Sequence, residues 1–261
     1  LQEAYEWLGA HGFALPYPDG GHGGGLNFDL YLVPGVEHAA AAATDAPIAW
    51  AEFDAATTHA LIDSALDDAA LPHCALIALT EAALLGREPA EDEGVRRAVA
   101  AFIGSIRDAQ FGCVNTTEDA QRAPELGTRG ALDEQVAAAS LWLAMLSQRH
   151  DAGTGRFIRD AWDLGRQKSE QPDRLHETPT FWQAMAATLD KAGESLDESA
   201  IEFSVARYFA GHALGALPSL TRVPVAIAPA FSTLPKRPAK PAAALATYGS
   251  AYTSVDTHGA A

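Results

Sequence analysis

The sequence predicts a mainly α-helical protein of the α+β class, and three observations lead to this prediction. Apolar residues recur at three- and four-residue spacing through most of residues 71–212, as they do in amphipathic helices. Two short runs nearer the N-terminus, residues 27–33 and 47–53, instead alternate with the period of a β-strand. A hydrophobic content of 48% in 261 residues is enough for one large core or two smaller ones. We therefore expect a small N-terminal sheet, a central buried helix and a helical C-terminal part.

Residues 1–70 are the predicted mixed β/α part. The expected elements are a helix, two strands and a short connecting helix, over residues 1–12, 27–33, 47–53 and 57–67. On the connecting helix, His59 and Asp63 stand four residues apart on one face, which fits a surface hydrogen bond as well as two metal ligands. Two donors alone cannot fill the coordination shell of zinc.

The loop before the first strand is rich in glycine, between Gly20 and Gly25. It precedes a strand and does not link a strand to a helix, so the context excludes a phosphate-binding loop. Asp19, Asn27 and Asp29 carry oxygen atoms of the kind that calcium prefers. A calcium site and a plain surface loop both remain open here.

Residues 71–215 form the predicted helical body, and its first helix is apolar almost all round. Between Cys74 and Leu85 only Thr80 and Glu81 are polar, as in a helix that lies inside a large domain. A carboxylate in such a place costs free energy unless it is paired or faces a cavity. Glu81 is therefore functional, the remnant of a function, or hydrogen-bonded for structural reasons.

A second helix over residues 93–110 follows an acidic connector, and its apolar stripe is regular. This order of apolar helix, Glu81, connector and amphipathic helix resembles the core of zinc metallopeptidases of the gluzincin kind. There one helix carries His-Glu-x-x-His and the next supplies a carboxylate ligand. The opening of the chain, with its Pro-Asp-Gly loop and Asp-x-Tyr-Leu strand, is similar to the entry of secreted bacterial relatives of these enzymes.

The resemblance implies a zinc site that has lost its ligands. Thr80 and Leu84 would occupy the two histidine positions, Arg97 the third ligand position, and Glu81 the position of the general base. None of the three replacements offers an imidazole, thiolate or carboxylate, so zinc is expected to be absent. Arg97 could neutralise Glu81 in place of the metal. An ordinary core helix with one hydrogen-bonded glutamate fits the same residues.

His73 lies two helical turns before Thr80, roughly 10 Å away along the axis, so it could not replace the first ligand without moving the metal. The two cysteines, Cys74 and Cys113, stand near the start of the first helix and just beyond the second. Antiparallel helices would bring these ends together, so we predict a disulfide, with two buried free thiols as the alternative. A disulfide implies an oxidising compartment.

Four further helices are expected, over residues 131–149, 156–167, 179–192 and 196–212. Thr178 before Pro179 reads as an N-cap, and Ser195 with Glu198 as a capping box. Residues 216–261 read as a separate extended, Pro- and Lys-rich segment that ends in a strand over 245–256. The last strand either begins a β module that continues in a longer chain or packs against the helical body. Because residues 1–13 read as the middle of a domain, we expect the natural N-terminus, with its signal peptide, to lie upstream, and we expect an extracellular or cell-envelope location.

The charge excludes some partners. With 34 acidic and 18 basic residues the net charge is −16, which disfavours nucleic acid and anionic membranes. No uncharged apolar run reaches 18 residues, so no membrane span is expected. Three functions remain possible. The first is a non-catalytic relative of metallopeptidases that binds a peptide or protein in a vestigial cleft, and the second is a purely structural or interaction helical domain. The third is a metallohydrolase with rearranged ligands from His59, His73 or Glu81.

Overall fold

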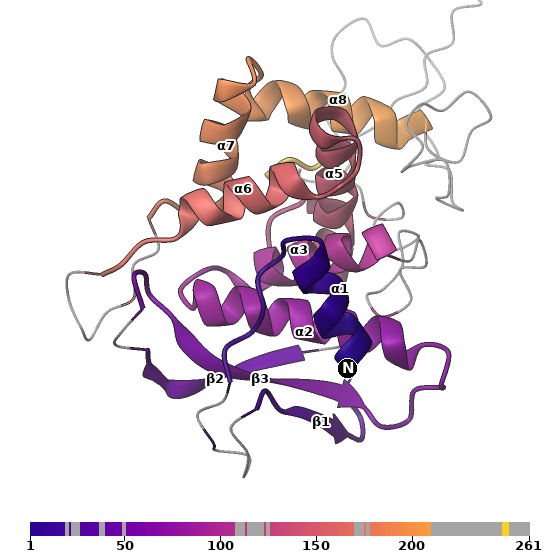
Figure 1. Ribbon diagram of the computed structural model, residues 1–261. Coiled ribbons are helices and arrows are strands. Elements are labelled where there is room, and N and C mark those ends of the chain that lie inside the picture. The colour runs from indigo at the N-terminus through magenta and orange to yellow at the C-terminus, as the bar shows by residue number, and fades with distance from the viewer. Residues whose placement is uncertain are drawn as a thin grey trace, which may run out of the picture.

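The computed structural model describes residues 1–18, 21, 27–36, 40–48, 51–107, 113, 123, 126–169, 175, 178–209 and 247–250. In these residues seven helices and one three-stranded sheet are formed. The mainly helical α+β class predicted from the sequence is confirmed at this level. Figure 1 shows the elements stacked in layers, with the sheet at one end of the molecule and α7 and α8 at the other.

The sheet consists of β1 (Leu30–Val33), β2 (Ala40–Pro47) and β3 (Ala56–Asp63). β3 lies in the middle, parallel to β1 and antiparallel to β2. The register between β2 and β3 shifts between Ala43 and Pro47. The residues of β3 are alternately buried and half-buried along its whole length, as expected for a strand with one face against a core.

The prediction for residues 47–67 was wrong. The second strand is the alanine-rich segment that ends at Pro47, and residues 56–63 form the central strand where a helix was expected. The β-branched Thr57, Thr58 and Ile62 favour an extended chain, and pairing on both sides of β3 outweighs the helix propensity of the alanines in β2. His59 and Asp63 are consequently about 13 Å apart along a strand, and the His59 ring meets Tyr31 edge-on, with 5.5 Å between ring centroids.

α2 (Leu71–Arg87) lies across one face of the sheet (Figure 1). Every residue from His73 to Gly86 is buried, in agreement with the apolar sequence of this helix. The helix comes close to β3 because Gly86 has no side chain: a Cβ there would lie 3.1 Å from the carbonyl oxygen of Ala56. The Thr58 hydroxyl also donates a hydrogen bond of 3.1 Å to the carbonyl of Ala82. The predicted central buried helix is therefore present.

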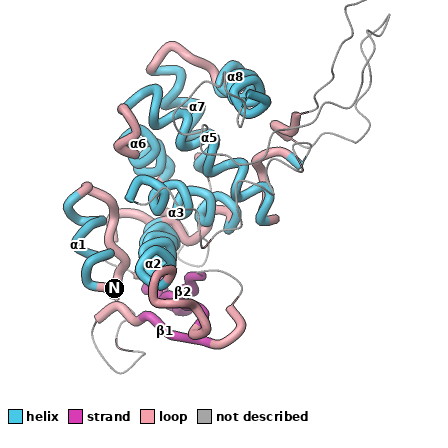
Figure 2. Tube along the Cα trace, turned by 90° about the vertical axis from the view of Figure 1, so that its right-hand side faces the viewer, coloured by secondary structure: helices cyan, strands magenta, loops and turns pink. Residues whose placement is uncertain are grey.

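α3 (Glu93–Arg107) covers the side of α2 that faces away from the sheet, and α1 (Gln2–Ala10) runs beside both (Figures 1 and 2). The buried stripe of α3 includes Val95, Val99 and Phe102, as the amphipathic pattern predicted. Gly94 lets the start of α3 approach the chain at Gly130 closely, because a Cβ on Gly94 would lie 2.0 Å from the carbonyl oxygen of Gly130.

The remaining helices form the far layers (Figure 2) and have the bounds α5 (Asp133–Asp151), α6 (Arg156–Gly165), α7 (Phe181–Lys191) and α8 (Leu196–Phe209). Trp142 of α5 is fully buried at their centre. Its ring stacks on Trp182 with 5.1 Å between centroids, and its Nε1 donates a 2.8 Å hydrogen bond to the hydroxyl of Ser199. Aromatic packing with a satisfied indole N–H thus joins α5, α7 and α8.

The capping box at the start of α8 is confirmed: the Ser195 hydroxyl accepts a hydrogen bond of 3.2 Å from the Glu198 amide, and the Glu198 carboxylate accepts one of 3.0 Å from the Ser195 amide. The predicted N-cap of α7 was wrong. The cap is Thr180 instead of Thr178, because Thr180 forms a reciprocal capping box with Gln183 and the helix begins at Phe181.

Most of the predicted extended segment 216–261 lies outside the described residues. Residues 247–250 are described, and they form a turn where a strand was expected. The Tyr248 ring packs against Trp142, and the guanidinium carbon of Arg129 lies 5.0 Å from the centroid of the Tyr248 ring. The Ser250 hydroxyl donates a 2.7 Å hydrogen bond to the Ser204 hydroxyl. This turn is therefore bound to the helical body. No helix in the described part of the chain is long and apolar enough to cross a membrane.

Candidate functional site

The buried carboxyl group of Glu81 is the centre of the predicted site. Glu81 lies on α2 with 3% of its surface exposed, and its Oε2 has no hydrogen-bond partner among the described residues. Burial raises the pKa of this carboxyl group to about 7. Arg96 and Arg97 on α3 lower the pKa, and Glu93 raises it, but burial dominates. The glutamate is thus about half protonated at neutral pH and largely protonated below it.

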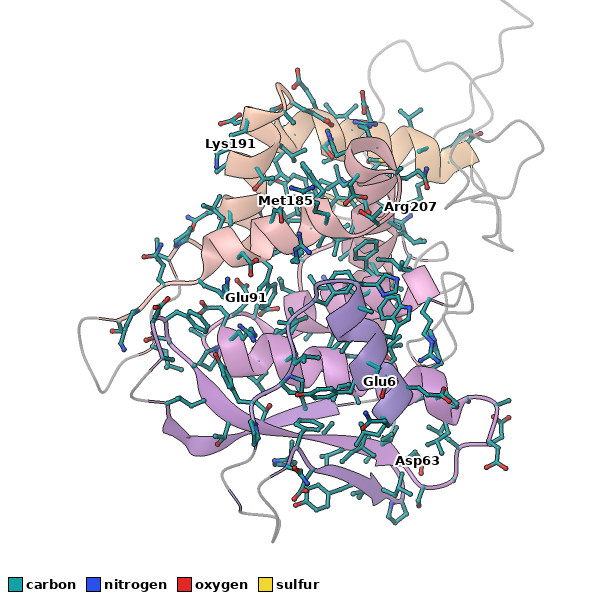
Figure 3. The ribbon with its side chains drawn as sticks, viewed as in Figure 1. Glu6, Asp63, Glu91, Met185, Lys191 and Arg207 are labelled. Carbon is teal, nitrogen blue, oxygen red and sulfur yellow. A yellow bond between two sulfur atoms is a disulfide. The ribbon has the colours of Figure 1, made fainter. Side chains whose placement is uncertain are left out.

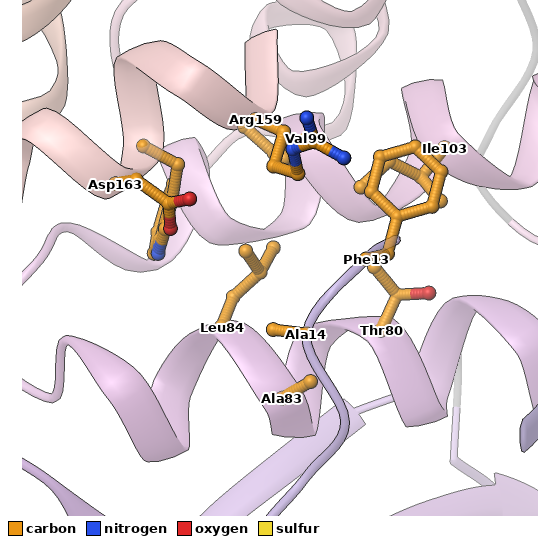
Figure 4. A pocket seen from close by; sticks show the side chains of 10 residues that line it. Phe13, Ala14, Thr80, Ala83, Leu84, Val99, Ile103, Arg159 and Asp163 are labelled. Carbon is orange, nitrogen blue, oxygen red and sulfur yellow. The ribbon is translucent and has the colours of Figure 1, made fainter. Parts of the chain in front are cut away.

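Thr80 and Leu84, at the two lost histidine positions, face a cavity between α2, α3 and α6 (Figure 4). The remaining lining residues are Phe13, Ala14, Ala83, Val99, Ile103, Arg159, Trp162 and Asp163. The cavity has a volume of about 20 Å³, which is room for about one water molecule. The Thr80 hydroxyl donates a 2.7 Å hydrogen bond to the Leu76 carbonyl of its own helix. These two positions therefore meet a small, mainly apolar pocket that reaches the charged side chains of Arg159 and Asp163.

Arg97, at the third ligand position, forms its hydrogen bonds with the segment at the start of α5. Its guanidinium donates to the carbonyl of Ala131, at 2.8 Å, and pairs with the carboxylate of Asp133 at the start of α5. Arg97 is not among the residues that line the cavity with Thr80 and Leu84. It influences Glu81 through its charge, but the ion pair that it forms joins α3 to α5.

Arg96 was missed by the sequence interpretation. Among the charged groups near Glu81, it lowers the pKa of this carboxyl group the most. Its guanidinium donates to the carbonyl of Glu91 in the connector before α3. Helical spacing could have drawn attention to it, because Arg96 lies three residues before Val99, which faces α2 across the cavity.

The other predicted donor residues do not assemble. In the residues that the structure describes, no group of three or more His, Cys, Asp or Glu side chains is placed to hold a metal ion. His59 is on β3, and His73 is buried at the start of α2, beside Gly104 of α3. Asp19 lies outside the described residues, and Asp29 accepts a 3.0 Å hydrogen bond from the hydroxyl of Tyr31.

A disulfide joins Cys74 and Cys113, as the antiparallel arrangement of α2 and α3 predicted. The two Cα atoms are 5.4 Å apart, and 39 positions separate the residues in sequence. The bond ties the start of α2 to the chain beyond the end of α3. It thereby closes the pair of helices that carries Glu81.

The structure also reveals an acidic group that the sequence interpretation missed. Glu88, directly after α2, is 5% exposed, and the backbone amides of Gln167 and Ala90 approach its carboxyl group without offsetting the effect of burial. Its pKa is raised to about 8, mainly by burial and then by the charges of Glu91 and Asp54. The sequence offered no signal for this, since Glu88 opens an acidic connector that is typical of a solvated surface.

Comparisons of the chain with protein-family models, with curated proteins and with solved structures find no match.

Proposed function

We propose that the chain is a non-catalytic relative of the gluzincin-type zinc metallopeptidases, a pseudo-peptidase whose remaining work is to bind a peptide or protein. The observation that carries this proposal is Glu81, a buried and incompletely hydrogen-bonded carboxyl group at the general-base position of a central helix. The helix lies on a small sheet that contains an antiparallel strand pair, and an amphipathic helix follows it. The Cys74–Cys113 disulfide supports the further proposal of an extracellular or cell-envelope location.

Restoring the lost ligands tests the metallopeptidase part of this proposal. Thr80→His with Leu84→His would place two imidazoles one turn apart on the face that meets the cavity. We expect the wild-type protein to contain no stoichiometric zinc, and the double variant to bind zinc at least about tenfold more tightly than Thr80→His alone. Elemental analysis and competition with a chromogenic chelator measure both.

Two outcomes contradict this part of the proposal. If the double variant binds zinc no better than Thr80→His, the two positions do not converge as ligands and the ancestry fails. If the wild-type protein contains stoichiometric zinc and cleaves casein in a reaction that a chelator stops, the protein is an active metallohydrolase with an unconventional site.

The nearly filled cavity favours a second candidate, a structural or interaction helical domain without a cleft. Phe13 and Trp162 are the two aromatic side chains that line this cavity, so a peptide that entered it would have to displace them. Phe13→Leu enlarges this space, so a vestigial cleft should bind fluorescently labelled casein peptides several-fold more tightly after the change. Phe157→Leu, a matched change on α6 where the ring stacks on His150, should not alter binding. Fluorescence anisotropy that shows no binding by any of the three proteins supports the structural domain.

A further inference from the structure

Glu88 lies where four segments of the chain meet. It directly follows α2, and its neighbours Glu91 and Asp54 belong to the α2–α3 connector and to the segment Ala51–Asp54 between β2 and β3. The backbone amides of Gln167 and Ala90 also approach its carboxyl group and lower its pKa, but each does so less than burial and the charges of Glu91 and Asp54 raise it. The segment Arg166–Ser169 after α6 therefore closes the fourth side. Figure 3 labels Glu91 in this region, between α6 and the sheet layer.

Hydrogen bonds of the two neighbouring carboxylates hold these segments together. The Asp54 amide donates to the Gln167 carbonyl at 2.7 Å, and the Ser169 amide donates to Oδ1 of Asp54 at 2.9 Å. Oε2 of Glu91 accepts a 2.6 Å hydrogen bond from the amide of Phe181, the first residue of α7. The sheet, the end of α2 and the start of α7 are thus joined around Glu88.

The charged groups near Glu88 repel a negative charge there. Glu91 and Asp54 are the charged groups that act on it, and both raise its affinity for a proton. The cations described in the surrounding segments are not among the charges that set the pKa of Glu88, and they make contacts of their own. Arg166 pairs with Asp163 at 2.7 Å and covers the ring of Phe53, the Lys168 ammonium donates to the Ala51 carbonyl, and Arg87 lies over the ring of Tyr17.

We propose that Glu88 is a proton-operated latch: its neutral carboxyl allows the segments 51–54 and 166–169 to close over the end of α2, and loss of the proton releases them. The ionised form would place a third negative charge beside Glu91 and Asp54 in a site that excludes water. Movement of the two segments would let water reach the carboxylate and so lower the cost of that charge. The proposal does not depend on the metallopeptidase resemblance.

The direction of the pH effect follows from the raised pKa. In the unfolded chain Glu88 loses its proton near pH 4.5, whereas in the closed fold it keeps the proton up to about pH 8. Closure is therefore fully favoured below pH 4.5, becomes less favourable as the pH rises, and is least favourable above about pH 8. A protein that enters an alkaline compartment would open at this junction first.

Hydrogen exchange measured by NMR on the folded wild-type protein tests the latch. The amides of Asp54, Ser169 and Phe181 report on it, since each donates one of the hydrogen bonds described above. After correction for the intrinsic pH dependence of exchange, we expect their protection to fall at least about tenfold between pH 6 and pH 9.

Two variants identify the proton involved. Glu88→Gln is neutral at every pH, so its protection should not fall. Glu52→Gln, a change of an exposed residue in the segment 51–54, should behave as the wild type. Asp54→Asn keeps the Oδ1 acceptor but removes one repelling charge, so an ionised Glu88 costs less in the closed fold and protection should fall less between pH 6 and pH 9 than in the wild type. Unchanged wild-type protection, an equal fall in Glu88→Gln, or a fall in Asp54→Asn as large as that of the wild type would each overturn the proposal.

Discussion

Reduction of the Cys74–Cys113 disulfide is expected to lower the free energy of unfolding by about 4 kcal/mol, the value of the chain-entropy model for a closed loop of 39 residues. The bond encloses α2 and α3, so without it the unfolded chain regains the freedom of the whole segment that carries Glu81. For a chain of this length the melting temperature should fall by roughly 10 °C. Thermal unfolding in the presence and absence of a phosphine reductant measures this shift.

The double variant Cys74→Ala/Cys113→Ala is the control for this experiment. It should unfold at the temperature of the reduced protein, apart from the small cost of the void beside the buried Cys74, and the reductant should not affect it. An oxidised wild-type protein whose melting temperature does not respond to reduction would show that the packing of α2 and α3 alone holds this region together.

Glu81→Gln is expected to stabilise the protein in weakly alkaline solution and to have little effect at pH 4.5. The pKa of Glu81 is raised from 4.5 to about 7 by burial, so the folded protein must either keep the proton or bury a charge. The cost to the folded state therefore grows as the pH rises from 4.5 to 7 and stays constant above 7. At pH 8 this cost is at most roughly 3 kcal/mol, and a neutral glutamine avoids it.

Urea unfolding of the wild type and of Glu81→Gln between pH 5 and pH 8 measures this difference. The comparison separates Glu81 from Glu88, because Glu88 is present in both proteins and contributes equally to their pH dependence. Glu6→Gln changes an exposed residue of α1, labelled in Figure 3, and its difference from the wild type should not vary with pH. A constant difference between Glu81→Gln and the wild type across this range would mean that Glu81 is solvated.

Helices were predictable from this sequence wherever one stripe of the helix meets a core. The apolar periodicity located α3 and α8 correctly, and the near absence of polar residues identified α2 as buried. The region between residues 47 and 67 could not be assigned in the same way. Alanines in β2 carry no strand preference, and the alternation within β3 becomes decisive only once the strand is paired on both sides.

The candidate site was harder to predict than the fold, because a helical pattern gives the face of a residue but not the neighbour that covers it. Arg97 was expected beside Glu81, yet its guanidinium meets the start of α5, and no sequence spacing reveals this contact. Glu88 was hidden for a related reason: it sits in a stretch of acids, and only the later packing of residues 166–169 removes it from water.

The layered order of the molecule has a consequence for how the chain acquires its structure. The sheet, α2, α3 and the later helices are stacked in nearly the order in which they are synthesised, so neighbouring layers mostly come from neighbouring parts of the chain (Figure 2). Closing short loops costs little entropy, which favours rapid and stepwise assembly from the N-terminal end. The turn around Tyr248, which returns to α5 from more than a hundred residues away, is then among the last parts to dock.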